Sequence, residues 1–268
     1  MILDQGTLLF PGPLKLSIGS IRKPKLSEIY YLSFPKFEFY EVMLKATPET
    51  IYTEILGGQY KEYWENLDYN SKNKTTVYSI IENNDSIKDI YLEILDFFFV
   101  EKVIYYDRYF IIVNPNVSED SLSKEDIVGF INSDLFFTVI EILQQICCIY
   151  EKNNEPKEEL KFKNEFTRKM YEKLQKAKKE QKARKAKESS KDLSLPNIIS
   201  AVSNMHPSIN PINIWDMTIY QLCDSFNRLQ VNKIYEINRT TVAVWGDEKK
   251  TFDSSLWYKN NIDNNNDS

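Results

Sequence analysis

Glycine is scarce in this chain, and that scarcity limits the folds open to it. Seven glycines occur among 268 residues, at positions 6, 12, 19, 57, 58, 129 and 246. Folds with many tight turns need glycine, because glycine alone adopts positive φ without a steric cost. The 15 Phe, 17 Tyr and 4 Trp can fill a substantial core. We therefore predict a mainly α fold with a small β element, an α+β arrangement of helices joined by short connections.

Proline is frequent in the first 40 residues. Pro11, Pro13, Pro24 and Pro35 separate short apolar runs. Each proline disfavours the helical conformation for the residue before it. We expect residues 1–40 to form an extended arm or a set of edge strands.

A helical domain with a β-hairpin is predicted for residues 41–155. Thr47-Pro48-Glu49 is typical of a helix start, and Gly57-Gly58 ends that helix. Further helices are expected at about 60–67, 75–83 and 86–98, the last with Ser86 as a cap.

The later part of that domain changes in character. Residues 103–106 and 109–113 are β-branched and aromatic, and Asp107-Arg108 lies between them, which predicts the hairpin. Ser123-Lys124-Glu125-Asp126 resembles a capping arrangement. The apolar run at 126–150 then predicts a buried helix, with a candidate break near Asn132-Ser133.

A basic helical linker is predicted for residues 156–195. Residues 157–191 hold 14 Lys or Arg and six Glu, a net charge of +8, within a chain whose total is −5. Lysines at this density can contact phosphates, but Glu172, Glu180 and Glu188 interrupt them, as in self-paired exposed helices. A solvated linker is favoured over nucleic-acid binding. The candidate phosphate contacts are Lys176, Lys178, Lys179, Lys182, Arg184 and Lys185.

A C-terminal helical unit is predicted for residues 196–260, followed by a disordered tail at 261–268. Its helices are expected at about 197–205 and 213–231, and a short strand at 239–245. Apolar residues on one face of the second helix, and at intervals of four in the linker, are candidates for binding another protein. These candidates are Trp215, Ile219, Leu222, Phe226, Phe162, Phe166 and Met170.

Residues that carry enzymatic chemistry cannot be assembled into a known pattern. His206 is the one histidine, and the glycines form no phosphate-binding loop. Carboxylates such as Asp85, Asp89 and Asp96, or Glu151 with Glu155, leave open a metal-dependent enzyme, but their spacing matches ordinary solvated helix faces. We expect no catalytic residue, no metal site and no cofactor.

The cellular location of the protein is predicted from its apolar segments, its N-terminus and its cysteines. No stretch reaches the ~18 uncharged apolar residues that a membrane helix requires, and the N-terminus lacks a secretory pattern. Three cysteines cannot form a disulfide framework. We expect a cytoplasmic protein without membrane contact.

Two helical segments stand out in the C-terminal unit: Pro196-Asn197-Ile198-Ile199-Ser200-Ala201-Val202, and Ile214-Trp215-Asp216-Met217-Thr218-Ile219-Tyr220-Gln221-Leu222 with Phe226. This pair resembles small assembly proteins from the tail modules of tailed phages, most closely the tail assembly chaperones. If a phage encodes the protein, the expected cytoplasm is that of the host. The resemblance implies a non-enzymatic protein of phage morphogenesis that binds other proteins, with a tail tape-measure protein as the candidate partner. A nucleic-acid-binding accessory protein and a structural virion component remain as alternatives, and the sequence does not indicate the oligomeric state.

Overall fold

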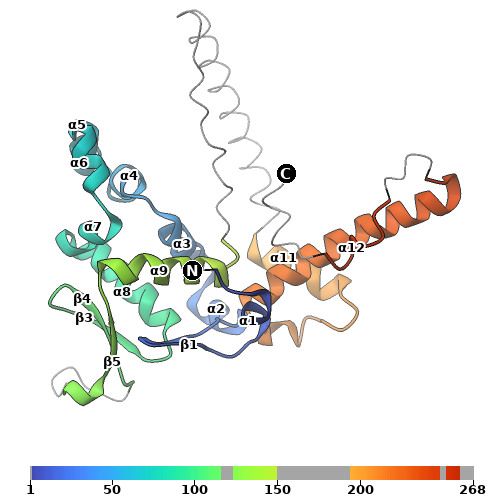
Figure 1. Ribbon diagram of the computed structural model, residues 1–268, viewed down its shortest axis with the longest axis horizontal. Coiled ribbons are helices and arrows are strands. Elements are labelled where there is room, and N and C mark those ends of the chain that lie inside the picture. The colour runs from blue at the N-terminus through green and yellow to red at the C-terminus, as the bar shows by residue number, and fades with distance from the viewer. Residues whose placement is uncertain (1, 116–122, 150–193, 248–251, 260–268) are drawn as a thin grey trace, which may run out of the picture. The chain divides into compact units, whose positions relative to one another are not determined.

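A computed structural model of the protein describes residues 2–115, 123–149, 194–247 and 252–259 (Figure 1). The described chain is mainly α-helical with two small antiparallel sheets, so the predicted fold class is confirmed. It divides into two compact units. Unit 1 comprises residues 1–150 with 215–221, and unit 2 comprises residues 151–214 with 222–268.

Unit 1 begins with three helices and two short paired strands where an extended arm or a set of edge strands was expected. Pro35 lies in the first turn of its helix, where a missing N–H breaks no helical hydrogen bond. Pro35 therefore marks a helix start, whereas Pro11, Pro13 and Pro24 lie in non-helical chain. The elements are α1 (Gln5–Leu9), β1 (Leu14–Leu16), β2 (Gly19–Ile21), α2 (Leu26–Leu32) and α3 (Phe34–Lys45).

Short helices follow, and side-chain caps set their starts. The Thr47 hydroxyl accepts a hydrogen bond from the Thr50 N–H at 3.2 Å, and Gly57 has a φ of 59° where the first of these segments ends. Asn84, and not Ser86, caps the helix that begins at Asp85, by accepting from the Ile87 N–H at 3.1 Å. The elements are α4 (Pro48–Thr50), a π-helical turn (Ile51–Leu56), α5 (Gly58–Asn66), α6 (Tyr69–Lys74), α7 (Val77–Asn83) and α8 (Asp85–Phe98).

The predicted hairpin is confirmed, and a third strand extends it. Strands β3 (Lys102–Tyr106) and β4 (Tyr109–Val113) pair across a turn in which Asp107 and Arg108 both have positive φ, 46° and 68°. Strand β5 (Ile127–Ile131) pairs with β4, which gives the order β3-β4-β5. The sheet is antiparallel throughout.

The prediction of one buried helix across 126–150 was wrong at its start. Ser123 and Asp126 do form a capping box, but it opens a 3-10 turn that leads into β5. The helix α9 (Ser133–Ile146) begins only after the predicted break, where the Asn132 side chain accepts from the Leu135 N–H at 2.9 Å. The open edge of β4 accounts for the strand, because pairing with it satisfies the backbone groups of residues 127–131.

The core of unit 1 lies between the three-stranded sheet and the helices beside it (Figure 1). Phe110 of β4 stacks with Phe136 of α9 at 6.3 Å between ring centroids, and Tyr78 of α7 lies edge-on to both rings. The Tyr78 hydroxyl donates to the Arg108 and Ile131 carbonyl oxygens at 2.7 and 3.2 Å. The aromatic cluster therefore joins α7, β4 and α9, which are distant from one another in sequence.

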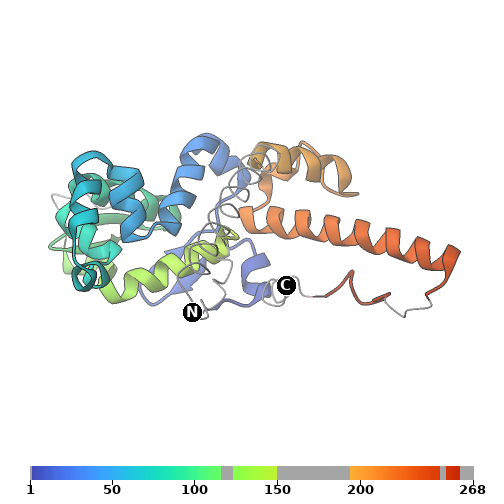
Figure 2. The ribbon, with the colours of Figure 1, turned by 90° about the horizontal axis from the view of Figure 1, so that it is seen from above.

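Unit 2 is built on two helices, α11 (Leu195–Met205) and α12 (Ile219–Trp245), of which α12 begins within unit 1. The strand predicted at 239–245 was wrong, because these residues are the last turns of α12. Figure 2 shows α11 beside the first half of α12 only. The predicted linker helix and the predicted disordered tail lie outside the described residues.

Candidate protein-binding surfaces

Trp215 belongs to the packing of unit 1. It lies in a 3-10 turn, Ile214–Asp216, and its ring meets Tyr30 of α2 edge-on at 5.6 Å between centroids. The chain that follows is anchored by hydrogen bonds from the Leu26 N–H to the Met217 oxygen at 2.9 Å and from the Ile219 N–H to the Pro24 oxygen at 3.1 Å. Trp215 was predicted to contact another protein; its ring contacts Tyr30 of the same chain and is partly buried, and the contact with another protein stays a prediction.

Two further predicted contact residues are also buried within the chain. The side chain of Ile219 is 2% exposed and that of Leu222 is fully buried. Neither can contact a partner without unfolding its surroundings. Phe226, one turn further along α12, is half-buried and reaches the surface.

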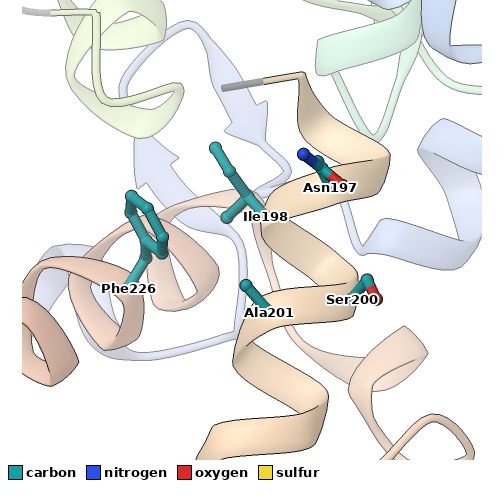
Figure 3. Close-up of a pocket in the computed structure, with 5 residues that line it drawn as sticks. All are labelled: Asn197, Ile198, Ser200, Ala201 and Phe226. Carbon is teal, nitrogen blue, oxygen red and sulfur yellow. The ribbon is translucent and has the colours of Figure 1, made fainter. Parts of the chain in front are cut away.

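A shallow hollow of about 210 Å³ lies where Phe226 faces α11. Figure 3 shows the Phe226 ring on the same side of α11 as Ile198 and Ala201. Asn197 and Ser200 complete the lining and are exposed. The hollow is smaller than the ~300 Å³ at which pockets for small-molecule ligands begin. Its size and its apolar base suit one or two side chains of a partner, as in the docking of a helix into a groove.

Beyond α11, the second half of α12 exposes apolar side chains. Ile234, Ile237, Val244 and Trp245 are 53%, 64%, 65% and 81% exposed. An apolar stripe on a helix normally faces a core. No described residue covers this stripe.

The opposite face of α12 is covered by residues 252–259, which run back along it (Figure 2). Phe252 packs against Tyr235 at 5.6 Å between ring centroids, and the Arg228 guanidinium donates to the Lys259 carbonyl oxygen at 2.8 Å. Within the returning segment, hydrogen bonds from Lys259 and Ser255 lower the pKa of Asp253 to about 2. Within the described part of the chain, residues 252–259 thus cover one face of α12, and the face with Ile234 and Ile237 is exposed.

The outer face of the three-stranded sheet in unit 1 is a second exposed apolar surface. Its inner face carries Phe110 and Ile112, both fully buried. An antiparallel sheet usually presents polar side chains to water on its outer face. Here, Tyr106 and Phe130 are 68% and 52% exposed. The outward side chains are Ile104, Tyr106, Tyr109, Ile111, Val128 and Phe130.

The remaining predicted site residues cannot be placed. All of them fall at 150–193, outside the described ranges. They are the apolar stripe Phe162, Phe166 and Met170, and the candidate phosphate contacts Lys176, Lys178, Lys179, Lys182, Arg184 and Lys185.

Two of the carboxylates weighed as catalytic groups, Asp85 and Asp96, have structural partners. Asp85 pairs with Lys88 at 2.5 Å, and Asp96 accepts from the Val103 N–H at 3.0 Å. His206 follows α11, and its Nδ1 accepts from the Ser208 N–H at 3.2 Å. Among the described residues, no three His, Cys, Asp or Glu side chains gather as a metal site would require. Glu151 and Glu155 lie outside these residues.

Comparison with known proteins bears on unit 2. Residues 182–261 match the family model described as the YomV second domain. The match indicates a phage-derived protein. It spans α11, the hollow and the whole of α12, so the candidate surface lies within the YomV-like part of the chain. No curated protein and no solved structure matches the chain significantly. None of the helices in the described part has both the length and the apolarity of a membrane span.

Proposed function

We propose that this protein is a non-enzymatic, protein-binding factor of phage morphogenesis, and more narrowly a tail assembly chaperone. The observation that carries the proposal is the hollow at Phe226, with apolar side chains exposed further along α12. Both features lie within the part of the chain that is similar to the YomV second domain. The proposed ligand is an amphipathic helix of a tail protein, with the tape-measure protein as the first candidate.

The chemistry of the hollow fits such a ligand. Phe226, Ile198 and Ala201 provide an apolar base that one large side chain of a partner helix would cover. The exposed Asn197 and Ser200 provide a polar rim. Interfaces of this kind draw most of their affinity from a few apolar anchors in the centre. A chaperone of this design covers apolar helices before they assemble and so prevents their aggregation.

The direct test is capture of tail proteins by the purified, full-length chain. Ala201→Glu places a charge in the hollow and is expected to reduce capture at least tenfold, because the charge would be buried on binding. Asn204→Glu adds the same charge at an exposed position of α11 and is the matched control. Equal capture by both variants would remove the hollow from the proposal.

The genetic test uses a phage that lacks the gene. Loss of tails, with aggregation of the tape-measure protein, is expected. Normal tails in the deletion phage would contradict the proposed role. Mass spectrometry of purified particles then separates a chaperone, which is absent from virions, from a structural component, which is present.

The basic segment 157–191 is the observation that favours nucleic-acid binding as a second candidate, because its net charge is +8. Such binding would weaken steeply as salt concentration rises. Replacing Lys176, Lys178, Lys179, Lys182 and Lys185 by Gln, together with Arg184→Gln, should abolish it. The proposed chaperone activity predicts that this variant still captures the tail protein.

A further inference from the structure

Residues 215–221 belong to unit 1 by their contacts, although by sequence they lie within the YomV-like part of the chain. We call them the clasp segment. Thr218 at its centre is fully buried. Its backbone pairs with that of residues 24–26 through the N–H groups of Leu26 and Ile219. The clasp segment therefore holds the first turn of α12 in unit 1.

A glutamine at the end of the clasp segment connects it to α1. The Gln221 side-chain oxygen accepts from the Thr218 N–H at 3.0 Å, and the Thr218 hydroxyl accepts from the Gln221 N–H at 3.2 Å, which forms a capping box for α12. The nitrogen of the same side chain donates to the Leu9 carbonyl oxygen of α1 at 2.8 Å. One amide group thus links the start of α12 to the last residue of α1.

A second glutamine connects α1 to the end of α9. The Gln145 side-chain oxygen accepts from the Leu3 N–H at 2.7 Å, and its nitrogen donates to the Glu141 carbonyl oxygen of α9 at 3.0 Å. Unit 1 ends its first stretch at residue 150, shortly after α9, and resumes at the clasp segment. The α1 region therefore contacts both the segment where the chain leaves unit 1 and the segment where it returns.

Lys23 fastens α1 with charged hydrogen bonds. The residue is 4% exposed, and its ammonium donates to the carbonyl oxygens of Thr7 and Phe10 at 2.5 and 2.7 Å. Hydrogen bonds from a charged donor are stronger than neutral ones, and the dipole of a helix favours a cation at its last carbonyls. Because Lys23 directly precedes residues 24–26, it ties α1 to the stretch of backbone that holds the clasp segment.

The helix α1 is a weak element by itself. It has five residues, whereas isolated helices shorter than ~12 residues are marginal in water. Leu8 is its one buried residue. Its helical state therefore depends on the Leu8 contacts and on the side chains of Lys23, Gln145 and Gln221. Segments with so few buried contacts open at a lower free energy than the core.

We infer that α1 is a latch on the clasp segment, and that opening of α1 loosens the first turn of α12 before the rest of unit 1 unfolds. Opening removes the Leu9 carbonyl that the Gln221 amide binds. It also leaves the buried ammonium of Lys23 without its two acceptors, beside residues 24–26. A buried charge without partners is costly, so this backbone shifts and its bonds to the clasp segment break. The inference does not rest on the proposed function, because it uses no residue of the hollow.

Hydrogen exchange of single backbone amides, followed by NMR on the full-length protein, tests the latch. In the wild type, the Leu8 and Phe10 amides of α1 should exchange faster than the Leu26 and Ile219 amides, and these faster than the amides of β3 and β4. Leu8→Ala removes the buried anchor of α1 and keeps Lys23. It should speed exchange of the Leu26 and Ile219 amides by about tenfold or more and leave the sheet within about twofold.

Lys25→Ala is the control, because Lys25 contacts the clasp segment directly but from an exposed position. Its ammonium pairs with the Asp216 carboxylate at 3.4 Å, and exposed pairs contribute little. Exchange of the Leu26 and Ile219 amides should therefore change by less than about threefold. If Leu8→Ala does not fold, Leu8→Val removes a smaller part of the same anchor and should give the same order of effects.

Three results would overturn the latch. The first is unchanged exchange at Leu26 and Ile219 while the α1 amides exchange faster. The second is an equal rise in β3 and β4, because unit 1 would then open as one body. The third is a rise in Lys25→Ala as large as that in the Leu8 variant.

Discussion

Gly129 of β5 lies directly against the backbone of Ile18 in the turn between β1 and β2. A Cβ at position 129 would be 2.5 Å from the Ile18 carbonyl oxygen and 2.6 Å from its Cα. Both atoms belong to the backbone, so no side-chain rotation can relieve the overlap. The two sheets of unit 1 therefore approach each other at a point where only glycine fits.

Gly129→Ala is expected to lower the free energy of unfolding by about 1–3 kcal/mol, because one of the two backbones must move. Urea unfolding measures the change. Val128→Ala is the control, because it also changes only methyl groups at a neighbouring position of β5. Val128 is exposed, so this change causes no overlap with another backbone. Its cost should stay below about 1 kcal/mol. Equal costs for both variants would show that the close approach to Ile18 is not maintained in solution.

Arg108→Gly is expected to stabilise the β3-β4 hairpin. Asp107 and Arg108 both have positive φ, and Asp-Gly is a favoured pair for such a two-residue turn. Glycine removes the steric cost at position 108 but adds flexibility to the unfolded chain, so the net gain is up to about 1 kcal/mol. The Arg108 carbonyl, which accepts from Tyr78, is retained.

Thermal unfolding of Arg108→Gly and Arg108→Ala separates the backbone effect from loss of the side chain. Alanine keeps the steric cost at positive φ and should not raise the melting temperature. A melting temperature for Arg108→Gly at or below that of Arg108→Ala would contradict the positive φ at this position.

Glu41 of α3 should make unit 1 less stable as the pH rises. Burial raises the pKa of this carboxyl from 4.5 to about 7, with Glu38 adding to the effect and Lys45 opposing it. The folded state therefore holds a proton that the unfolded state releases. The resulting stabilisation is complete below pH 4.5 and is lost as the pH rises through about 7. The full change is about 3 kcal/mol, because one pKa unit corresponds to about 1.4 kcal/mol.

Glu41→Gln should remove this dependence and be more stable than the wild type at pH 8. Urea unfolding at pH 5 and pH 8 measures both effects. Glu38→Gln changes an exposed carboxylate on the same helix and should largely keep the wild-type pH profile. If Glu41→Gln and the wild type lose stability equally between the two pH values, the burial of Glu41 is not the cause.

Local signals in the sequence predicted much of the fold. Thr47 marks a helix start through its own side-chain hydrogen bond, and Asp107-Arg108 marks a turn between β-branched runs. Asn132 lies at the predicted break and caps the helix that follows. Such features depend on a few neighbouring residues. Strand β5 could not be predicted in this way, because its residues become a strand by pairing with β4. The last turns of α12 were predicted as a strand from their Thr and Val, but the preceding helix continues through them at a small cost in propensity.

The candidate surface was predicted only in outline. The two helical segments and Phe226 were recognised, and the hollow does lie between them. The sequence does not indicate which apolar positions the chain itself covers. Ile219 and Leu222 belong to the core, whereas Ile234 and Ile237 lie on the surface, although all four occur on one amphipathic helix. Burial of this kind is set by contacts between segments distant in sequence.

Trp215 and Phe226 should respond differently to truncation, and the difference tests the proposed binding site. Trp215→Ala removes the edge-on contact with Tyr30 and is expected to lower the stability of unit 1 by about 1–3 kcal/mol, with capture of the tail protein unchanged. Phe226→Ala removes the aromatic wall of the hollow and should weaken capture at least fivefold. Melting curves and capture assays on the same two proteins measure both quantities.

The opposite result has a definite meaning. If Trp215→Ala abolished capture while the melting temperature stayed constant, the anchor would be the Trp215 side chain, as the helical pattern of the sequence predicted. The binding site would then lie in unit 1 beside Tyr30, outside the hollow. Since the Trp215 ring is only partly buried, a partner could contact it without unfolding the chain, so the two variants distinguish two physically accessible sites.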